Sequence, residues 1–156
     1  MLKHGISHVF SFLSILSSLL SHKGKKMTIS LICLFITLIL PLIPRLFVAK
    51  AQARTQEGYN NSLPREQQKN LDALGQRALG AHLNSFEALQ MFTAAIVVAH
   101  LSNAPQVWVD RFSLLFIASR IIFIFAYLKD MPSLRSAIWF VGFLATLLVA
   151  GSAWIK

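Results

Sequence analysis

Residues 112–128 read FSLLFIASRIIFIFAYL, an apolar stretch that is interrupted only by two serines and Arg120. A helix needs about 20 mostly apolar residues, and at least about 17, to cross the hydrocarbon core of a bilayer. This stretch meets the requirement, and so do three others, at residues 28–48, 78–101 and 137–155. The sequence therefore predicts an all-α integral membrane protein, a four-helix bundle with up-down-up-down topology.

Composition favours a membrane protein over a soluble one. Of the 156 residues, 55% are hydrophobic and 13% are charged, and the mean hydropathy is +0.59. Soluble domains carry about 25% charged residues, so much of the usual solvating charge is missing. The net charge of +9 is also typical of nucleic-acid-binding proteins, but the cations lie between apolar stretches and form no basic face interleaved with aromatic residues. We therefore predict the lipid bilayer as the partner, and no nucleic acid.

Residues 1–26 precede a membrane domain that is predicted at residues 27–156. Residues 9–21 are apolar but too short to span a bilayer, and lysines flank them on both sides. This pattern is typical of a signal-like or interfacial helix. The alternative is that Met27 is the true start and that the extension is a gene-model artefact.

The distribution of cations predicts the orientation in the membrane. Four crossings place the connections 49–76 and 129–136 on one side of the bilayer. That side carries most of the cations of the domain, and the opposite side carries Arg111 and Lys156. The positive-inside rule then places both connections in the cytoplasm. For a bacterial chain, this predicts a multi-pass protein of the inner or plasma membrane.

Two ionisable residues, Glu87 and Arg120, lie within predicted spans. Each costs about 2.5–3.5 kcal/mol on insertion scales, so such groups usually face the interior of a bundle. At 1.5 Å per residue, Glu87 lies about 15 Å along its helix from Arg77, and Arg120 lies about 13 Å from Lys129. The similar depth predicts an ion pair, which either holds two helices in register or belongs to a functional site.

Polar groups share one stripe of the second predicted span. At 100° per residue, these groups fall on one side of the helix. We expect this side to face protein, because an unsatisfied amide in hydrocarbon costs several kcal/mol. Tyr127 and Arg135 are predicted in the same cytoplasmic half of the bundle. A cationic site with a phenol and an amide suits a small polar anion acting on an apolar partner from the bilayer. The alternative is that the arginines only reach lipid phosphates. The stripe consists of Arg77, Gly80, Asn84, Glu87 and Met91.

Two runs of the chain resemble motifs of a known family. Residues 76–87, QRALGAHLNSFE, resemble the second-helix motif of the membrane-associated proteins in eicosanoid and glutathione metabolism, the MAPEG superfamily. Residues 120–128 and then 132–136 resemble its third-helix and third-loop motif. Within the superfamily, the sequence AHLNSFEAL at residues 81–89 is most similar to the uncharacterised bacterial branch.

The resemblance implies a homotrimer of four-helix subunits, with glutathione bound at the cytoplasmic half of the interface between neighbouring subunits. It implies a glutathione transferase or peroxidase that acts on a lipophilic small-molecule electrophile. Arg135 matches an arginine that stabilises the glutathione thiolate, and Ser136 matches a serine beside it with a catalytic part in one subgroup. The residues expected to bind glutathione or organise its site are Arg77, Asn84, Glu87, Arg120 and Tyr127.

The sequence also departs from the family pattern. Gly80 and Leu83 stand where members of different subgroups have arginine, and Phe123 stands where some have histidine or tyrosine. Fewer guanidinium groups mean fewer bidentate partners for the two carboxylates of glutathione. Lys50 or Arg45 is a candidate to supply the positive charge that these missing guanidinium groups would provide. One alternative function is therefore a non-catalytic or other-ligand member of the family. Another is a small proton-coupled exporter that uses Glu87.

Overall fold

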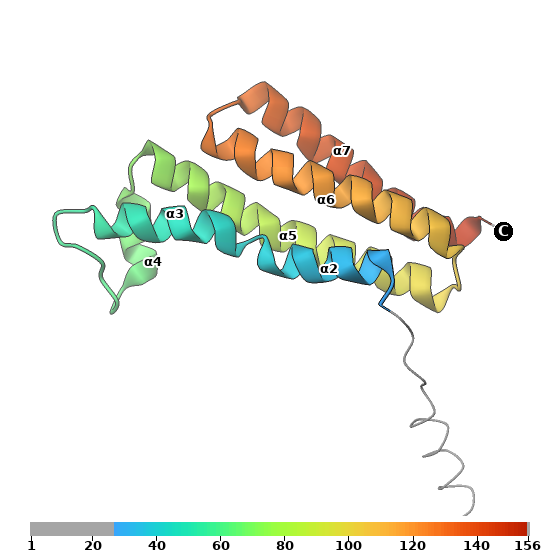
Figure 1. Cartoon of the computed structure of the whole chain (residues 1–156). Helices are drawn as coiled ribbons and strands as arrows, with labels where there is room; N and C mark the ends of the chain where they lie inside the picture. The colour runs from blue at the N-terminus through green and yellow to red at the C-terminus, as the bar shows by residue number, and fades with distance from the viewer. Residues whose placement is uncertain (1–26, 156) are drawn as a thin grey trace, which may run out of the picture.

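The structure is a computed structural model that describes residues 27–155, so the predicted segment at residues 1–26 lies outside the described residues. All regular elements in the described part are helical, which confirms the predicted all-α class. Figure 1 shows the long helices side by side: the first two run in the same direction, one after the other, and the three long helices that follow run in alternating directions. The elements are α2 (Ile29–Ile39), α3 (Leu42–Ala53), α4 (Pro64–Gln67), η1 (Gln68–Asn70), α5 (Ala73–Leu101), α6 (Gln106–Leu128), α7 (Pro132–Gly151) and η2 (Ser152–Trp154).

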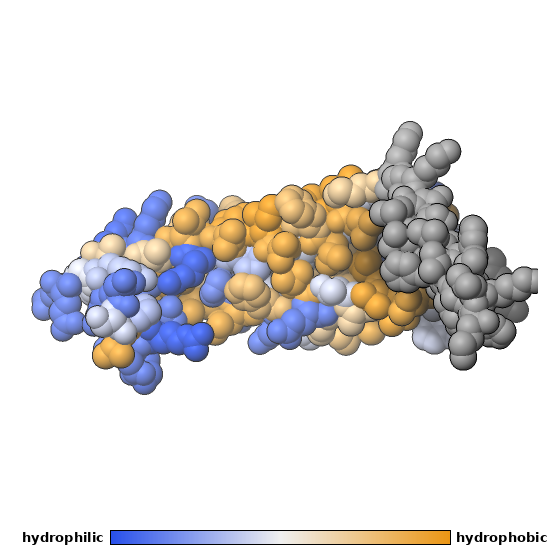
Figure 2. Space-filling view, turned by 90° about the horizontal axis from the view of Figure 1, so that it is seen from below, coloured by the Kyte–Doolittle hydropathy of each residue, from blue (hydrophilic) through white to orange (hydrophobic). Residues whose placement is uncertain are grey.

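Three helical segments of the described chain are long and apolar enough to cross a membrane, namely Ile29–Ala53, Gln106–Leu128 and Pro132–Trp154. They support the predicted membrane location. The predicted span 78–101 lies in α5, which is not among the three, so its crossing stays a prediction. Figure 2 shows apolar side chains along the length of the helices and polar side chains at the end that carries α4.

The helices α5, α6 and α7 all begin before the apolar stretches that predicted them. Asp72 caps α5, because its Oδ1 accepts a hydrogen bond from the Gly75 N–H at 2.7 Å. Pro132 occupies the start of α7, where its missing N–H costs no helical hydrogen bond. Arg135 and Ser136, which the sequence predicts at the end of the connection 129–136 and next to the fourth span, therefore lie in the first turns of α7.

The first predicted span contains Pro41 and Pro44, and it is broken there into α2 and α3. Proline removes a backbone donor and its ring clashes with the preceding turn. α2 ends at Ile39 and α3 begins at Leu42, so the chain bends at Pro41. Nδ1 of His82 on α5 lies 2.9 Å from the Pro41 carbonyl oxygen. This hydrogen bond ties the bend to α5.

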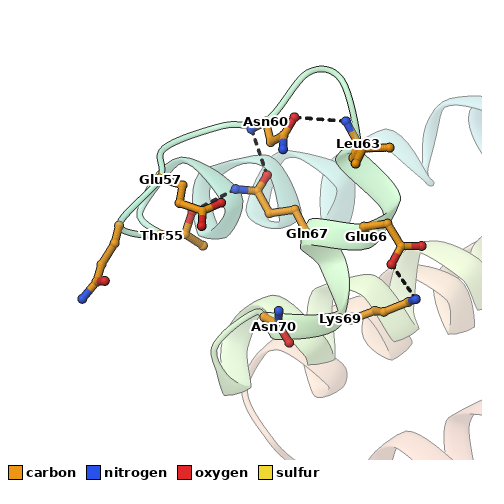
Figure 3. A pocket seen from close by; sticks show the side chains of 9 residues that line it. Thr55, Glu57, Asn60, Leu63, Glu66, Gln67, Lys69 and Asn70 are labelled. Atoms are coloured by element: carbon orange, nitrogen blue, oxygen red, sulfur yellow. Dashed lines mark hydrogen bonds and ion pairs between the residues drawn. The ribbon is translucent and has the colours of Figure 1, made fainter.

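The connection between α3 and α5 is folded around two glutamines. Gln52 is fully buried, and its Nε2 donates to the Pro64 carbonyl at 2.8 Å. Gln67 accepts from the Asn60 N–H at 3.1 Å and donates to Oγ1 of Thr55 at 2.8 Å (Figure 3). Residues of this connection line an open, polar cavity of about 460 Å³, and none of the predicted site residues lines it.

The main core lies between α2, α5, α6 and α7. Phe92 of α5 stacks on Phe116 of α6 with ring centres 4.0 Å apart, and both side chains are buried. Gly142 of α7 lies directly against Ser119 of α6, because a Cβ at position 142 would come within 2.6 Å of the Ser119 Oγ. The close approach of α6 and α7 therefore depends on this glycine.

Gly142→Ala is expected to lower the unfolding temperature in detergent. The added methyl group must either displace the Ser119 hydroxyl from its hydrogen bond to the Phe116 carbonyl or push α6 and α7 apart, and overpacking of this kind costs about 1–3 kcal/mol. Gly151→Ala is the matched control in the same helix, because a Cβ there meets nothing within 4 Å. Thermal unfolding followed by circular dichroism compares the two variants. Equal unfolding temperatures would contradict the close packing described above.

Candidate functional site

A cavity of about 230 Å³ brings four of the predicted site residues together. Asn84 comes from α5, Tyr127 from α6, and Arg135 and Ser136 from α7. The cavity thus combines a cation and several hydrogen-bonding groups with aromatic rings, a lining that suits an anion beside an apolar surface. The lining residues are Asn84, Phe123, Tyr127, Arg135, Ser136 and Trp139.

The turn between α6 and α7 sets the position of Arg135. Asp130 in this turn has a φ of 58°, a left-handed conformation that aspartate and asparagine adopt more readily than most residues. The reversed backbone lets Pro132 start α7 two residues later. The guanidinium carbon of Arg135 then lies 4.7 Å from the ring centre of Tyr127. This distance is within the range of a cation–π contact.

Tyr127 packs directly on Gly80 of α5. A Cβ at position 80 would lie 2.7 Å from the Tyr127 hydroxyl oxygen and 3.0 Å from its ring. Any larger side chain at position 80 therefore requires Tyr127 to move. Gly80 is a position at which the resemblance leads us to expect arginine. In this chain, the phenol of Tyr127 occupies the space that a side chain at position 80 would need.

The two ionisable residues of the spans are linked by an amide. Arg120 is only 3% exposed, and its Nη2 donates to Oδ1 of Asn84 at 2.8 Å. Nδ2 of Asn84 donates to Oε2 of Glu87 at 2.9 Å. The predicted direct ion pair is therefore wrong: both ion pairs found among residues 27–155 involve other residues. Asn84 bridges the charges because an amide offers an acceptor to the cation and a donor to the anion.

The polar stripe of the second predicted span meets two environments. Arg77, Gly80 and Asn84 contact the α6–α7 hairpin, as we expect for a stripe that faces protein. Glu87 and Met91 are exposed on the surface of the single chain, so for these two the contact with protein stays a prediction. Neither Arg77 nor Glu87 lines the cavity.

Two lining residues, Phe123 and Trp139, are not among the predicted site residues. Phe123 lies four residues before Tyr127, and Trp139 lies four residues after Arg135, so each shares a helix face with a predicted residue. This spacing is the signal that points to them. Aromatic residues are common in apolar spans, so the spacing alone is not specific.

The comparison with known protein families decides the assignment. A family model described as the MAPEG family matches residues 27–155. The chain belongs to the MAPEG family. Searches of curated proteins and of solved structures find no match. The matched region of this MAPEG chain includes every residue that lines the cavity, and the hydrogen bond from Arg120 to Asn84 joins its two motifs.

Proposed function

We propose that this MAPEG protein is a glutathione-dependent transferase or peroxidase that acts on lipophilic electrophiles. The observation that supports the proposal is the cavity in which Arg135 lies over Tyr127, beside Asn84 and Ser136. A free thiol has a pKa of about 8.5, and a nearby cation lowers it. A guanidinium at this place therefore raises the thiolate fraction of bound glutathione at neutral pH.

The thiolate carries out the chemistry in both reactions. In the transfer reaction, its sulfur attacks an electrophilic carbon, and the leaving group departs with the electron pair of the broken bond. In the peroxidase reaction, the sulfur attacks the terminal oxygen of a hydroperoxide. An S–O bond forms as the O–O bond breaks, which gives glutathione sulfenic acid and an alkoxide that leaves as the alcohol once protonated. A second glutathione then converts the sulfenic acid to the disulfide and water. Phe123 and Trp139 offer the lipophilic partner an apolar surface.

The assembly we propose is a homotrimer in which α5 is a fourth membrane span at the subunit interfaces. Glu87 and Gln90 are exposed on α5 in the single chain. Polar side chains that face hydrocarbon are costly, and in membrane proteins they are usually covered by protein or line a cavity. A neighbouring subunit that packs on this face removes the cost.

The trimer also offers a second source of cations. A cavity of about 510 Å³ lies beside another face of α5, and Arg45, Arg65 and His82 are among its lining residues. We propose that this cavity adjoins the glutathione site of the next subunit. Arg45 then supplies a guanidinium in place of the arginine that is missing at position 80.

The proposed orientation keeps the site near the cytoplasmic surface of a multi-pass membrane protein. Lys129 and Asp130 in the α6–α7 turn are exposed, and so are Arg65 and Lys69 in the α3–α5 connection. The connections 49–76 and 129–136 then lie in the cytoplasm, as the positive-inside rule predicts.

Turnover by the purified protein tests the proposed activity. We expect glutathione to be conjugated to a chloronitrobenzene or oxidised by cumene hydroperoxide, and the detergent particle to contain three copies of the chain. Bound glutathione without turnover of either substrate would favour a non-catalytic member of the family, and no bound glutathione at all would favour a member that binds another ligand. Proton-coupled dye efflux from vesicles that Glu87→Gln abolishes would favour the exporter. A stable monomer would contradict a site at a subunit interface.

A further inference from the structure

The N-terminal end of α5 is tied to the turn between α6 and α7. Nη1 of Arg77 lies 3.2 Å from Oδ2 of Asp130. Nε of Arg77 is buried and has no hydrogen-bond partner among the residues that the structure describes. Asp130 is therefore the acceptor that holds this guanidinium in the described part of the chain. The side chain of Asp130 is 67% exposed, so its charge stays hydrated while it makes this contact.

This ion pair is the outermost of the contacts that positions 77, 80 and 84 of α5 make with the α6–α7 hairpin. Positions 77, 80 and 84 are three and four residues apart, which places them on the same face of the helix. Only the outermost contact reaches the turn itself, and the turn lies between Tyr127 and Arg135. The contacts are Arg77 with Asp130, Gly80 with Tyr127, and Asn84 with Arg120.

We propose that Arg77 and Asp130 are a positioning pair, which holds the turn so that Tyr127 stays on Gly80 and Arg135 stays over Tyr127. The significance of the pair for glutathione rests on the proposed function, whereas its effect on Tyr127 does not. Arg77 does not line the cavity, so it acts through the turn rather than by contact with the ligand. This differs from the expectation that Arg77 binds glutathione itself.

Fluorine NMR tests the placement of Tyr127 without any ligand. The chain has two tyrosines, Tyr59 and Tyr127, so protein labelled with 3-fluorotyrosine gives two signals. The variant Tyr59→Phe assigns them. Tyr59 lies in the connection between α3 and α5 and serves as an internal reference.

Asp130→Asn and Arg77→Gln are each expected to shift the Tyr127 fluorine signal. The double variant with both substitutions is expected to shift the signal no further than either single variant does. Asparagine keeps the size of the side chain and tolerates a left-handed backbone, so this variant removes only the charge. Lys129→Gln is the matched control, because Lys129 lies beside Asp130 but is in neither of the ion pairs found among the described residues. The Tyr59 signal is expected to stay in place in all of these variants.

The ultraviolet band of glutathione thiolate gives a second readout on the full trimer. Both single variants are expected to weaken glutathione binding by the same factor, about two- to fivefold, as for a partly exposed ion pair. The proposal is overturned if Asp130→Asn shifts the Tyr127 fluorine signal no more than the control Lys129→Gln does. It is also overturned if Arg77→Gln abolishes the band while Asp130→Asn keeps it, since Arg77 then contacts the ligand. A wild-type protein without any thiolate band refutes the proposed function. The fluorine signals then still test whether Arg77 and Asp130 position Tyr127.

Discussion

Arg135→Ala is expected to remove most of the glutathione-dependent activity. In the structure, the Arg135 guanidinium lies over Tyr127 and lines the proposed site. Without this cation, the pKa of the bound thiol rises toward its free value of about 8.5, so the thiolate fraction at neutral pH falls. Loss of one group that stabilises a reacting anion typically lowers the rate by about 10²–10³-fold. We expect kcat/KM to fall by a similar factor.

The pH dependence of the initial rate separates this effect from a general loss of structure. The rate of the wild type should level off once the bound thiol is ionised, whereas the rate of Arg135→Ala should keep rising into alkaline solution. Arg111→Ala is the matched control, because Arg111 lies over Trp108 at 5.1 Å in a similar cation–π contact. If Arg135→Ala kept the rate and the pH profile of Arg111→Ala, the proposed role of Arg135 would be wrong.

Asn84→Leu is expected to destabilise the fold strongly. The Asn84 amide accepts from the buried guanidinium of Arg120 and donates to Glu87. The leucine variant leaves the Arg120 charge buried without this acceptor, and losing a hydrogen bond to a charged group costs about 1.5–3 kcal/mol. We expect a large fall in the thermal unfolding temperature and a smaller yield of folded protein in detergent.

Two further variants test the explanation. Ser85→Ala is the neighbouring control, because the buried Ser85 hydroxyl bonds only to a carbonyl of its own helix, at 2.7 Å. The double variant Asn84→Leu with Arg120→Leu should recover part of the lost stability, because it no longer buries a charge. Asn84→Leu with the unfolding temperature of Ser85→Ala would show that the amide bridge contributes little.

The convergence of helices on one site could be predicted from the sequence for a physical reason. Apolar stretches of spanning length fix the approximate depth of each residue, and helical periodicity fixes its direction. Asn84, Tyr127 and Arg135 were therefore expected in the same half of the bundle, and the structure brings them to one cavity. The family motifs add the chemical roles, which no periodicity supplies.

Side-chain partners could not be predicted in the same way. Depth alone suggests that Glu87 and Arg120 meet, but the actual donor and acceptor distances depend on the rotation and spacing of the helices. Asp130 gives no signal in the sequence, because its partner Arg77 lies 53 residues away and neither residue is in an apolar stretch. The exposure of Glu87 similarly depends on packing between helices, which is decided by three-dimensional contacts.

The pairing of Gly80 with Tyr127 shows why a missing motif residue is hard to interpret from sequence. Read alone, the glycine indicates a lost cation and a weaker anion site. In the structure, its absent side chain is what allows the phenol to reach α5, since a Cβ would lie 2.7 Å from the hydroxyl oxygen. Gly80 therefore contributes to the site by making room for Tyr127.

Titration of the wild-type protein with glutathione, followed by ultraviolet difference spectroscopy near neutral pH, tests the central claim most directly. The claim is that the cavity between α5, α6 and α7 binds glutathione as a thiolate beside Arg135. We expect a thiolate absorption band that grows to saturation in the wild type and in Arg111→Ala, and that is lost in Arg135→Ala. A wild-type protein that shows no band at any glutathione concentration would contradict the claim.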